Sequence, residues 1–387
     1  MRRLAGRRTE SVSLLRACGD VWAGRDWSAS LTAADAGMVW ERAKAHGIAL
    51  PAPPADSALP SELRQSIRRA RMANALALER ACAQAREVGA ALASVGVEAV
   101  ALKGLALVGD LWQARDLGRD LGDLDLLVAW SDLDATVATM SALGYRQLPT
   151  ASSRAHYRLQ ARMGHLPPFT RPDSLLVEIH STPRPIRPER WRWEPELLRD
   201  GPPSIRPLRR LSAEAAFAHG AAHYLEDLTL TEFAALKGLA DLYLLSTSRD
   251  PELNPAVLEE LCGRWACRDA AAAAVATLSA TWGCGLSIGD GVEAISEARL
   301  ERLPGPPGSA IRRPEEYLGR FRSLRALSTG AERWDYLRGL ALPDPAYLRY
   351  HFGDERSPMG RLYLRYHRDA IRRLLRGLRQ PAKPGRI

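Results

Sequence analysis

The order of apolar and polar positions divides this chain into a helical beginning, a mixed middle and a helical end. Residues 10–95 have a helical pattern, and positions 73–95 carry apolar side chains near helical spacing. These side chains are Leu76, Ala83, Val88, Leu92 and Val95. A proline-rich stretch at positions 50–55 interrupts the earlier part. The pattern predicts an N-terminal helical region that covers residues 1–94.

Short apolar runs replace the helical pattern after Gly96. Positions 97–102 lie between two glycines, as expected of a β-strand, and a helix is predicted at positions 105–112. A second strand is predicted at positions 123–128, where the sequence is Asp-Leu-Asp-Leu-Leu-Val. These elements predict the first part of a sheet.

The acidic strand leads into a predicted helix, with Ser131 as its N-cap and Gly144 at its C-terminal stop. Positions 165–170 and 175–180 then form a predicted hairpin around an Arg-Pro-Asp-Ser turn. Positions 181–210 contain seven prolines and many arginines. They are predicted to be an irregular connection.

The chain returns to a helical pattern at Ser212, with helices predicted at 215–225 and 230–245 and a basic helix within 361–386. We therefore expect an α+β fold, with a central mixed sheet and its helices between N-terminal and C-terminal helical regions. The expected divisions are 1–94, 95–210 and 211–387.

Two carboxylates stand two residues apart on the second predicted strand. Because side chains alternate across a strand, Asp123 and Asp125 leave the same face of the sheet. Two neighbouring buried negative charges are unfavourable unless a cation neutralises them. Oxygen ligands favour Mg²⁺ or Mn²⁺, so this pair predicts a divalent-metal site.

A third carboxylate, Glu178, stands on the second strand of the predicted hairpin, and His180 shares its face. Three carboxylates on adjacent strands can hold two divalent ions, which bridge a triphosphate and orient its α-phosphorus for in-line displacement. Glu178 is also placed to receive the proton of an acceptor.

Basic residues precede the acidic strand. Lys103 and Gly104 end one strand and begin a helix, where glycine permits close approach of the backbone to a phosphate and a helix N-terminus favours anions. Lys103 can add a point charge on a triphosphate. Arg119 can do the same or pair with Asp120.

Composition adds little to these motifs. The chain is 46% hydrophobic and 26% charged, with a net charge of +9 that is compatible with a polyanionic partner without requiring one. Its five cysteines match no zinc or redox spacing, which favours a reducing cytoplasm. No signal peptide and no membrane span are expected from the sequence.

The motifs in this order resemble the nucleotidyltransferase superfamily, which includes polymerase β-like and kanamycin-type enzymes. Within it, the chain is most similar to uncharacterised bacterial nucleotidyltransferase proteins. The matching residues are Leu102-Lys103-Gly104, Arg119, Asp123-Leu124-Asp125-Leu126-Leu127-Val128, Gly144-Tyr145, Val177-Glu178-Ile179-His180, His219, His223 and Asp241. The resemblance covers about residues 95–245 and implies a nucleotidyltransferase-type sheet.

The resemblance implies that Asp123, Asp125 and Glu178 are catalytic residues and metal ligands, and that Lys103 and Gly104 lie at the phosphates. One departure concerns the turn, which is usually Gly-Ser in the superfamily and lacks that serine here. The spacing from Gly104 to Asp123 is also longer than in minimal members.

Four further residues are candidates for the acceptor side of the site. His180 either positions the acceptor or hydrogen-bonds at a strand end. His219 and His223 share one helix face and form either a structural pair or a wall of the cleft, since no glutamate lies between them to complete a zinc motif. Asp241 lies in an apolar helix and requires a partner, for which Lys237 and the histidines are candidates.

The C-terminal arginines follow three- and four-residue steps at Arg361, Arg365, Arg368 and Arg372, so that one helix face is cationic. This face either is solvated and paired with acids, or meets RNA, an acidic peptide or anionic lipid.

The sequence thus predicts a metal-dependent nucleotidyltransferase that moves an NMP from an NTP, ATP by default, to a hydroxyl or phosphate of an unidentified small-molecule, peptide or protein acceptor. Two alternatives are a DxD-type glycosyltransferase that uses a nucleotide sugar and a non-catalytic protein that binds nucleotide, RNA or peptide. Pyrophosphate release distinguishes the first from the second, and binding of Mg²⁺–NTP distinguishes the third.

Overall fold

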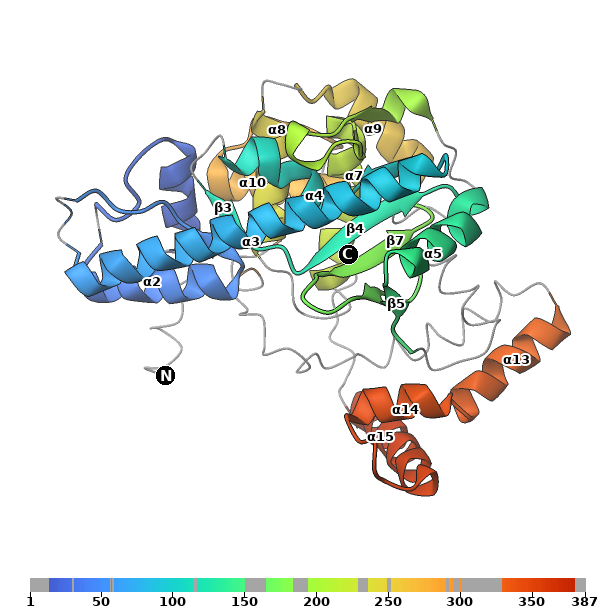
Figure 1. Cartoon of the computed structure of the whole chain (residues 1–387). Helices are drawn as coiled ribbons and strands as arrows, with labels where there is room; N and C mark the ends of the chain where they lie inside the picture. Colours follow the sequence, from blue (N-terminus) through green and yellow to red (C-terminus); the bar gives the residue numbers. More distant parts are fainter. Residues whose placement is uncertain are drawn as a thin grey trace.

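A seven-stranded mixed sheet lies at the centre of the structure, a computed structural model, with helices packed around it (Figure 1). The described residues are 14–29, 31–55, 57, 59–113, 117–149, 165–183, 194–228, 236–248, 252–289, 292–295, 300 and 329–379. The strands of the sheet are β2 (Ala99–Ala101), β4 (Asp123–Val128), β5 (Arg146–Gln147), β6 (Phe169–Thr170), β7 (Leu176–His180), β8 (Leu198–Asp200) and β9 (Arg209–Leu211). Their spatial order is β5-β6-β7-β4-β2-β9-β8. A separate ribbon pairs β1 (Ile48–Ala49) with β3 (Gly118–Arg119).

The helices form groups at the two sides of the sheet. Their bounds are α2 (Ala33–Ala45), α3 (Ser61–Ser94), α4 (Lys103–Leu107), α5 (Leu133–Ala142), α7 (Ala213–Glu226), α8 (Leu236–Thr247), α9 (Pro255–Trp265), α10 (Arg268–Trp282), α13 (Gly330–Ala341), α14 (Pro345–Phe352) and α15 (Met359–Arg379). The long helix α3 crosses in front of the sheet, while α7 to α10 gather at the top of the view (Figure 1). The expected α+β fold, with helical regions at both ends, is confirmed.

Strand β4 is the centre of the core. It pairs in antiparallel fashion with β2 and in parallel with β7, so no edge of it is open. Its side chains Leu124, Leu126 and Leu127 are fully buried, because helices cover both faces at this point. The predicted strand and its bounds agree with the structure, and so does the hairpin of β6 and β7.

The predicted irregular connection at 181–210 was wrong in its second half. Residues 198–200 and 209–211 form β8 and β9, and β9 extends the sheet beside β2 in parallel. A strand of three residues has almost no pattern of its own, so pairing with β2 decides its structure. Gly201 permits the return, because a Cβ there would overlap the carbonyl oxygen of Leu208. Positions 184–193 lie outside the described residues.

The long helix α3 buries a different stripe from the predicted one. Leu76 and Val95 are 58% and 55% exposed, whereas Val88 and Leu92 are fully buried. The buried stripe also contains Ala81, Cys82, Gln84, Ala85 and Gly89. Leu76 therefore lies outside the buried stripe of α3.

Three smaller helix predictions have mixed outcomes. Ser131 is not the N-cap of α5, because a short 3₁₀ turn over Trp130–Asp132 precedes the helix and places Asp132 at that position without a side-chain cap. Gly144 does follow the helix end, with a φ of 82° that favours glycine. The basic helix predicted near the C-terminus is α15. In the described part of the chain, no helix has the length and apolar character to cross a membrane.

A buried histidine connects the N-terminal helices to α8. His46 is fully buried at the end of α2, and its Nδ1 accepts a hydrogen bond from the backbone N–H of Leu236 at 3.1 Å. Burial, with a smaller contribution from the nearby Arg42 charge, lowers the pKa of His46 from 6.5 to about 4. The folded protein therefore holds this imidazole neutral.

We expect His46 to make the free energy of unfolding depend on pH. The unfolded chain binds a proton at this side chain below a pH of 6.5, and the folded chain does so only below about 4. Stability from this residue is therefore complete above pH 6.5 and declines as the pH falls toward 4, by up to about 3 kcal/mol. His46→Asn keeps an acceptor without the titration, so denaturant unfolding of this variant should depend less on pH. If the free energy of unfolding depended equally on pH in the parent and the variant, this role of His46 would be contradicted.

Candidate active site

The two acidic strands lie side by side. In the parallel register of β4 and β7, Asp125 stands opposite Glu178, so both carboxylates leave the same face of the sheet. His180 follows two residues later on that face. One ligand atom from each of these three side chains lies within 4.8 Å of the other two. Asp123 stands two residues before Asp125, at the start of β4, and is half-buried. The structure therefore brings Asp125, Glu178 and His180 closest together.

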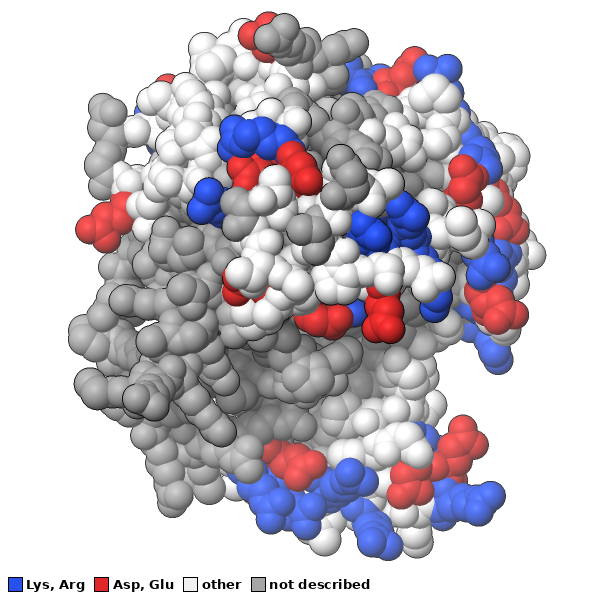
Figure 2. Space-filling view, turned by 90° about the vertical axis from the view of Figure 1, so that its left-hand side faces the viewer, with Lys and Arg blue, Asp and Glu red and all other residues white. Residues whose placement is uncertain are grey.

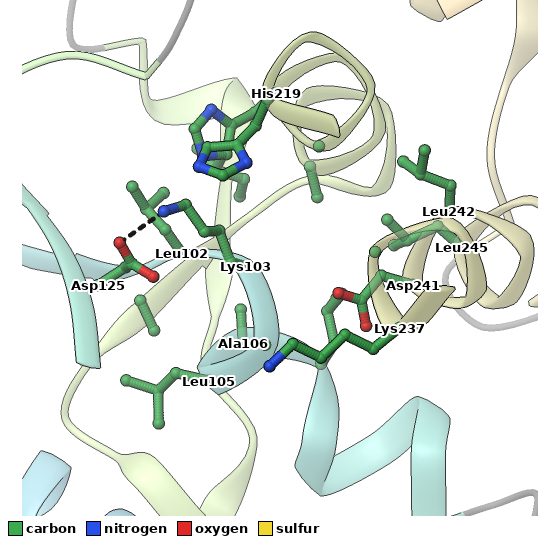
Figure 3. Close-up of a pocket in the computed structure, with 18 of the residues that line it drawn as sticks. Leu102, Lys103, Leu105, Ala106, Asp125, His219, Lys237, Asp241, Leu242 and Leu245 are labelled. Atoms are coloured by element: carbon green, nitrogen blue, oxygen red, sulfur yellow. Dashed lines mark hydrogen bonds and ion pairs between the residues drawn. The ribbon is translucent and has the colours of Figure 1, made fainter. Parts of the chain in front are cut away.

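A lysine ammonium neutralises the buried aspartate. Lys103 Nζ lies 2.8 Å from Asp125 Oδ1, and both side chains are mostly buried (Figure 3). Lys103 is the first residue of α4 and has a φ of 49°, a left-handed conformation that is unusual for a residue with a side chain. Such a backbone costs on the order of 1–3 kcal/mol. The ion pair between the Lys103 ammonium and the buried Asp125 carboxylate offsets this strain.

The pKa shifts of these groups follow from their positions. Burial opposes ionisation of Asp125, but the Lys103 ammonium and the His180 hydrogen bond hold its pKa well below the usual range. Burial and the Asp125 charge raise the pKa of Asp123. Burial alone lowers the pKa of Lys103, yet the three surrounding carboxylates raise it overall. One lysine therefore balances part of a charge cluster that contains three acids.

His180 is a neutral imidazole held against Asp125. Its Nε2 lies 2.8 Å from Asp125 Oδ1, and burial lowers its pKa to about 4. Because a carboxylate can only accept, Nε2 carries the hydrogen and Nδ1 has a free lone pair. Among the described residues, Nδ1 has no hydrogen-bond partner. His165 lies next to His180, with ring centroids 5.4 Å apart and its Nε2 3.5 Å from Glu178 Oε2.

A cavity of about 240 Å³ opens beside the aspartates, between α4, α7 and α8. Charged and polar side chains gather on its wall. They are Lys103, Arg119, Asp123, Asp125, Arg210, His219, His223, Tyr224, Asp227, Lys237, Asp241 and Ser248. Glu178 and His180 are not among its lining residues and stand on β7, the strand that pairs with β4. The aspartates therefore connect the cavity to the carboxylate and imidazole on β7.

Arg119 and Asp241 form a buried ion pair beneath α4. Arg119 Nη2 lies 2.8 Å from Asp241 Oδ2, and its Nε donates to Asp241 Oδ1 at 2.9 Å. Trp112 Nε1 donates to the same Oδ1 at 2.8 Å. The expected pairing of Arg119 with the Asp120 carboxylate was wrong, since Arg119 reaches only the Asp120 carbonyl. Lys237 is likewise not the partner of Asp241, and its Nζ donates to the Asp120 carbonyl at 3.3 Å.

This ion pair explains why position 104 is a glycine. A Cβ on Gly104 would overlap the guanidinium group of Arg119. Asp241 and Trp112 hold that guanidinium in place, so it cannot move away at low cost. The glycine therefore lets an arginine side chain approach the backbone of α4, in addition to any role at a phosphate.

The two histidines of α7 lie on the cavity wall. Their ring centroids are 6.3 Å apart, and His223 Nδ1 lies 3.1 Å from Asp227 Oδ2. His219 is buried and points toward the Lys103–Asp125 pair (Figure 3). This arrangement agrees with the interpretation of the pair as a wall of the cleft.

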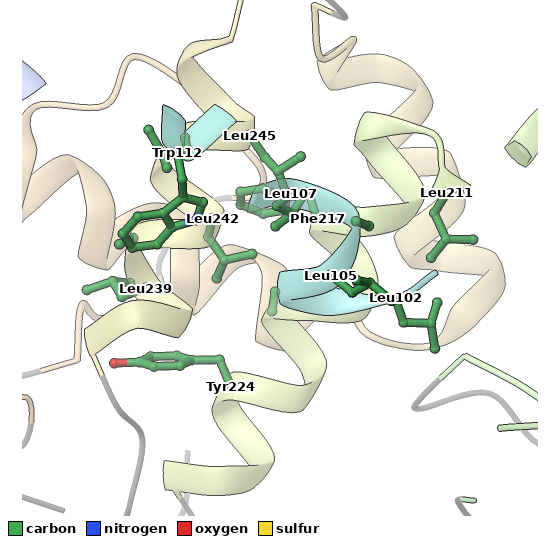
Figure 4. Close-up of a cluster of buried hydrophobic side chains, with 14 of the residues drawn as sticks. Leu102, Leu105, Leu107, Trp112, Leu211, Phe217, Tyr224, Leu239, Leu242 and Leu245 are labelled. Atoms are coloured by element: carbon green, nitrogen blue, oxygen red, sulfur yellow. The ribbon is translucent and has the colours of Figure 1, made fainter. Parts of the chain in front are cut away.

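Leucines fix the position of α4 relative to α7 and α8. Leu105 and Leu107 of α4 pack in one cluster with Leu242 and Leu245 of α8 and with Phe217 of α7 (Figure 4). Because these side chains are buried, α4 is held as a rigid wall between the sheet and the helices. Lys103 and Gly104 therefore have a fixed backbone.

Two residues of this region were not selected from the sequence. Lys237 lines the cavity, and burial together with the Arg119 charge lowers its pKa. From the sequence it was considered only as a partner of Asp241, with which it shares a helix face at four-residue spacing. His165 pairs with His180 across an antiparallel bridge, so the hairpin register could have placed it near Glu178.

One comparison with known proteins gives a match. A family model described as an uncharacterised nucleotidyltransferase matches residues 24–283, which is more than half of the chain. No curated protein and no solved structure matches the chain.

Replacement of Gly104 by alanine should destabilise the protein by about 1–3 kcal/mol, because the added methyl group forces the held Arg119 side chain from its place. Gly263→Ala in α9 is the matched control, since a Cβ there meets no atom within 4 Å. It should be neutral or stabilising by up to about 1 kcal/mol. Chemical denaturation measures both, and equal effects would show that Arg119 does not depend on the glycine.

Proposed function

The chain belongs to the uncharacterised nucleotidyltransferase family, and we propose that it transfers an NMP from an NTP, with ATP as the default, to an acceptor hydroxyl or phosphate. The single observation that carries this proposal is the place of Asp123 and Asp125 on the wall of a cavity with basic side chains, with Glu178 of β7 in register beside Asp125. A general nucleotidyltransferase role follows from the family match. The nucleotide, the metal and the acceptor are the proposed parts.

Asp123, Asp125 and Glu178 would hold one or two divalent cations, Mg²⁺ or Mn²⁺. Two observations support the fit. The parallel register places Asp125 and Glu178 on one face, and a lysine ammonium already lies 2.8 Å from Asp125. The ammonium beside Asp125 indicates that this position favours positive charge. A bound divalent ion supplies electrophilic polarisation of the phosphate oxygens.

The triphosphate would lie in the cavity against Lys103, Lys237 and the start of α4. Lys103 Nζ donates to Asp125 Oδ1 at 2.8 Å. A phosphate gives the ammonium a second anion within reach of the same flexible side chain. Arg119 also borders the cavity, but its bidentate bond to Asp241 assigns it mainly to holding α4 and α8 together.

In the proposed reaction, the acceptor oxygen forms a bond to the α-phosphorus while the bond from that phosphorus to the bridging oxygen breaks. Pyrophosphate takes the electron pair and leaves, and Glu178 receives the proton of the acceptor hydroxyl. His180 and His165 flank Glu178 and orient it. His219 and His223 would face the acceptor from the cavity wall.

The family match favours this reaction over a glycosyltransferase or a non-catalytic role, and all three predicted acids are retained. We also propose a cytoplasmic location, because the five cysteines are buried free thiols. Purified protein incubated with each NTP and Mg²⁺ or Mn²⁺, with and without cell extract, tests the activity through pyrophosphate release. Turnover of a nucleotide sugar without pyrophosphate would support the glycosyltransferase instead.

Asp123→Asn should abolish transfer while it stabilises the fold. The raised pKa of Asp123 means that ionisation of this carboxyl costs folding free energy at neutral pH, and asparagine removes that cost. Loss of a metal ligand should reduce kcat by about a thousandfold, since metal catalysis contributes several kcal/mol. Turnover and Tm are measured together, with Asp134→Asn, an exposed acid on α5, as the control that changes neither. Full activity of Asp123→Asn would refute the mechanism.

Lys103→Met should increase the affinity for Mn²⁺ in the absence of nucleotide. The ammonium occupies the space beside Asp125 that a cation needs, so its removal favours the metal. The same variant leaves Asp125 without its counter-ion and should lose about 3–5 kcal/mol of stability when no metal is present.

Calorimetric titration and the rise of Tm with Mn²⁺ measure these effects. Lys237→Met is the matched control, because Lys237 Nζ donates to a backbone carbonyl. Unchanged Mn²⁺ affinity of Lys103→Met would show that lysine and metal do not compete.

A further inference from the structure

The C-terminal helices expose an unusual amount of apolar surface. Among the described residues, eleven large hydrophobic side chains are classed as exposed, and five of them lie in α13 to α15 or between them. These five are Trp334, Leu342, Tyr350, Leu364 and Ile371. Isolated exposed leucines are ordinary, but a group within one small helical unit indicates a contact surface.

The outer face of α15 combines apolar and basic rows. Leu364 and Ile371 are 71% and 57% exposed and stand two turns apart, so they lie on one face. An arginine row adjoins them, consisting of Arg361, Arg365, Arg368 and Arg372, all exposed. We call these six residues the α15 face.

The opposite side of α15 is bound to its neighbours. Leu362 is buried, and the Tyr363 hydroxyl donates to the Pro343 carbonyl at 2.8 Å. Arg365 lies at the edge of the α15 face, where its guanidinium is 4.4 Å from the centroid of the Phe352 ring on α14. These contacts orient the helix and leave the α15 face outward. The apolar pair on that face is therefore not the inner side of this helical unit.

The arginines of the α15 face are largely without carboxylate partners. Within the described part of the chain, the only carboxylate within 4.0 Å of their guanidinium groups is Asp369, at 3.8 Å from Arg368. Between positions 359 and 379 the sequence contains seven arginines and one aspartate. Figure 2 shows blue side chains gathered along the lower edge of the molecule, where Figure 1 places α14 and α15.

We propose that the α15 face binds an anionic membrane surface, with the helix lying in the plane of the headgroups. Charge complementarity accounts for the arginine row, because each basic residue near an anionic leaflet strengthens binding. The exposed Leu364 and Ile371 would enter the boundary between headgroups and acyl chains. A nucleic acid uses the arginines but gives no apolar environment to these two side chains, so a membrane fits both rows.

Co-sedimentation of the full chain with vesicles tests this proposal. The vesicles consist of phosphatidylcholine alone or of phosphatidylcholine with phosphatidylglycerol, at low and at physiological salt. We expect binding to the anionic vesicles only. The double variant Arg361→Gln/Arg372→Gln should weaken it about fivefold per arginine. Leu364→Ser/Ile371→Ser should weaken it at least tenfold without any change of charge.

Matched controls come from α3, which exposes the same kinds of residue. Met72→Ser/Leu76→Ser removes apolar side chains that are 69% and 58% exposed, and Arg68→Gln/Arg69→Gln removes two exposed arginines. Both should bind as the parent protein does. Circular dichroism confirms that every variant keeps its helices.

Three results would overturn the proposal. They are equal binding to neutral vesicles, no binding to anionic vesicles, and an unchanged affinity of the Leu364→Ser/Ile371→Ser variant. An RNA oligonucleotide is titrated in parallel. If it binds through the arginines while the vesicles do not, the α15 face is a nucleic-acid surface instead.

Discussion

A buried carboxylate on the central strand is the constraint on which the rest of the site depends. Asp125 is 4% exposed in the middle of a sheet whose neighbouring side chains are leucine and valine. An ionised carboxylate in such a place needs positive charge and hydrogen bonds. Lys103 and His180 provide them, both at the same oxygen atom, Asp125 Oδ1. The strained backbone at Lys103 places the ammonium beside Asp125, and the pairing of β4 with β7 places His180 there.

A second ion pair holds the walls of the cavity in position. Arg119 ends β3, Asp241 belongs to α8, and Gly104 belongs to α4, so the Arg119–Asp241 pair connects three separate elements. Buried ion pairs are expensive to break, because each partner is left as an uncompensated charge. The leucine cluster of α4 and α8 packs on the other side of this pair. Charge and packing therefore fix the same helix.

The sequence predicted those parts of the molecule whose signals are local. The strand Asp123–Val128 was correct to the residue, and the shared face of its aspartates follows from strand periodicity alone. Strands β8 and β9 were missed because pairing with β2, not local pattern, creates them. The partner of Asp241 was missed for a similar reason, since Arg119 is 122 positions away and nothing local relates the two. The role of Gly104 toward Arg119 depends on that same distant contact. Hydrophobic periodicity also misjudged Leu76, because it does not reveal where a long helix leaves the core.

The lysine beside Asp125 has a consequence for metal selectivity. Two carboxylates and a neutral imidazole within 4.8 Å form a donor set that zinc and copper ions bind more strongly than magnesium. The Lys103 ammonium lies 2.8 Å from Asp125 and so occupies one position of that donor set. In the proposed mechanism, this ammonium competes with such transition metals for Asp125. A cation bound to the nucleotide phosphates would bring an anion that attracts the Lys103 ammonium away from Asp125.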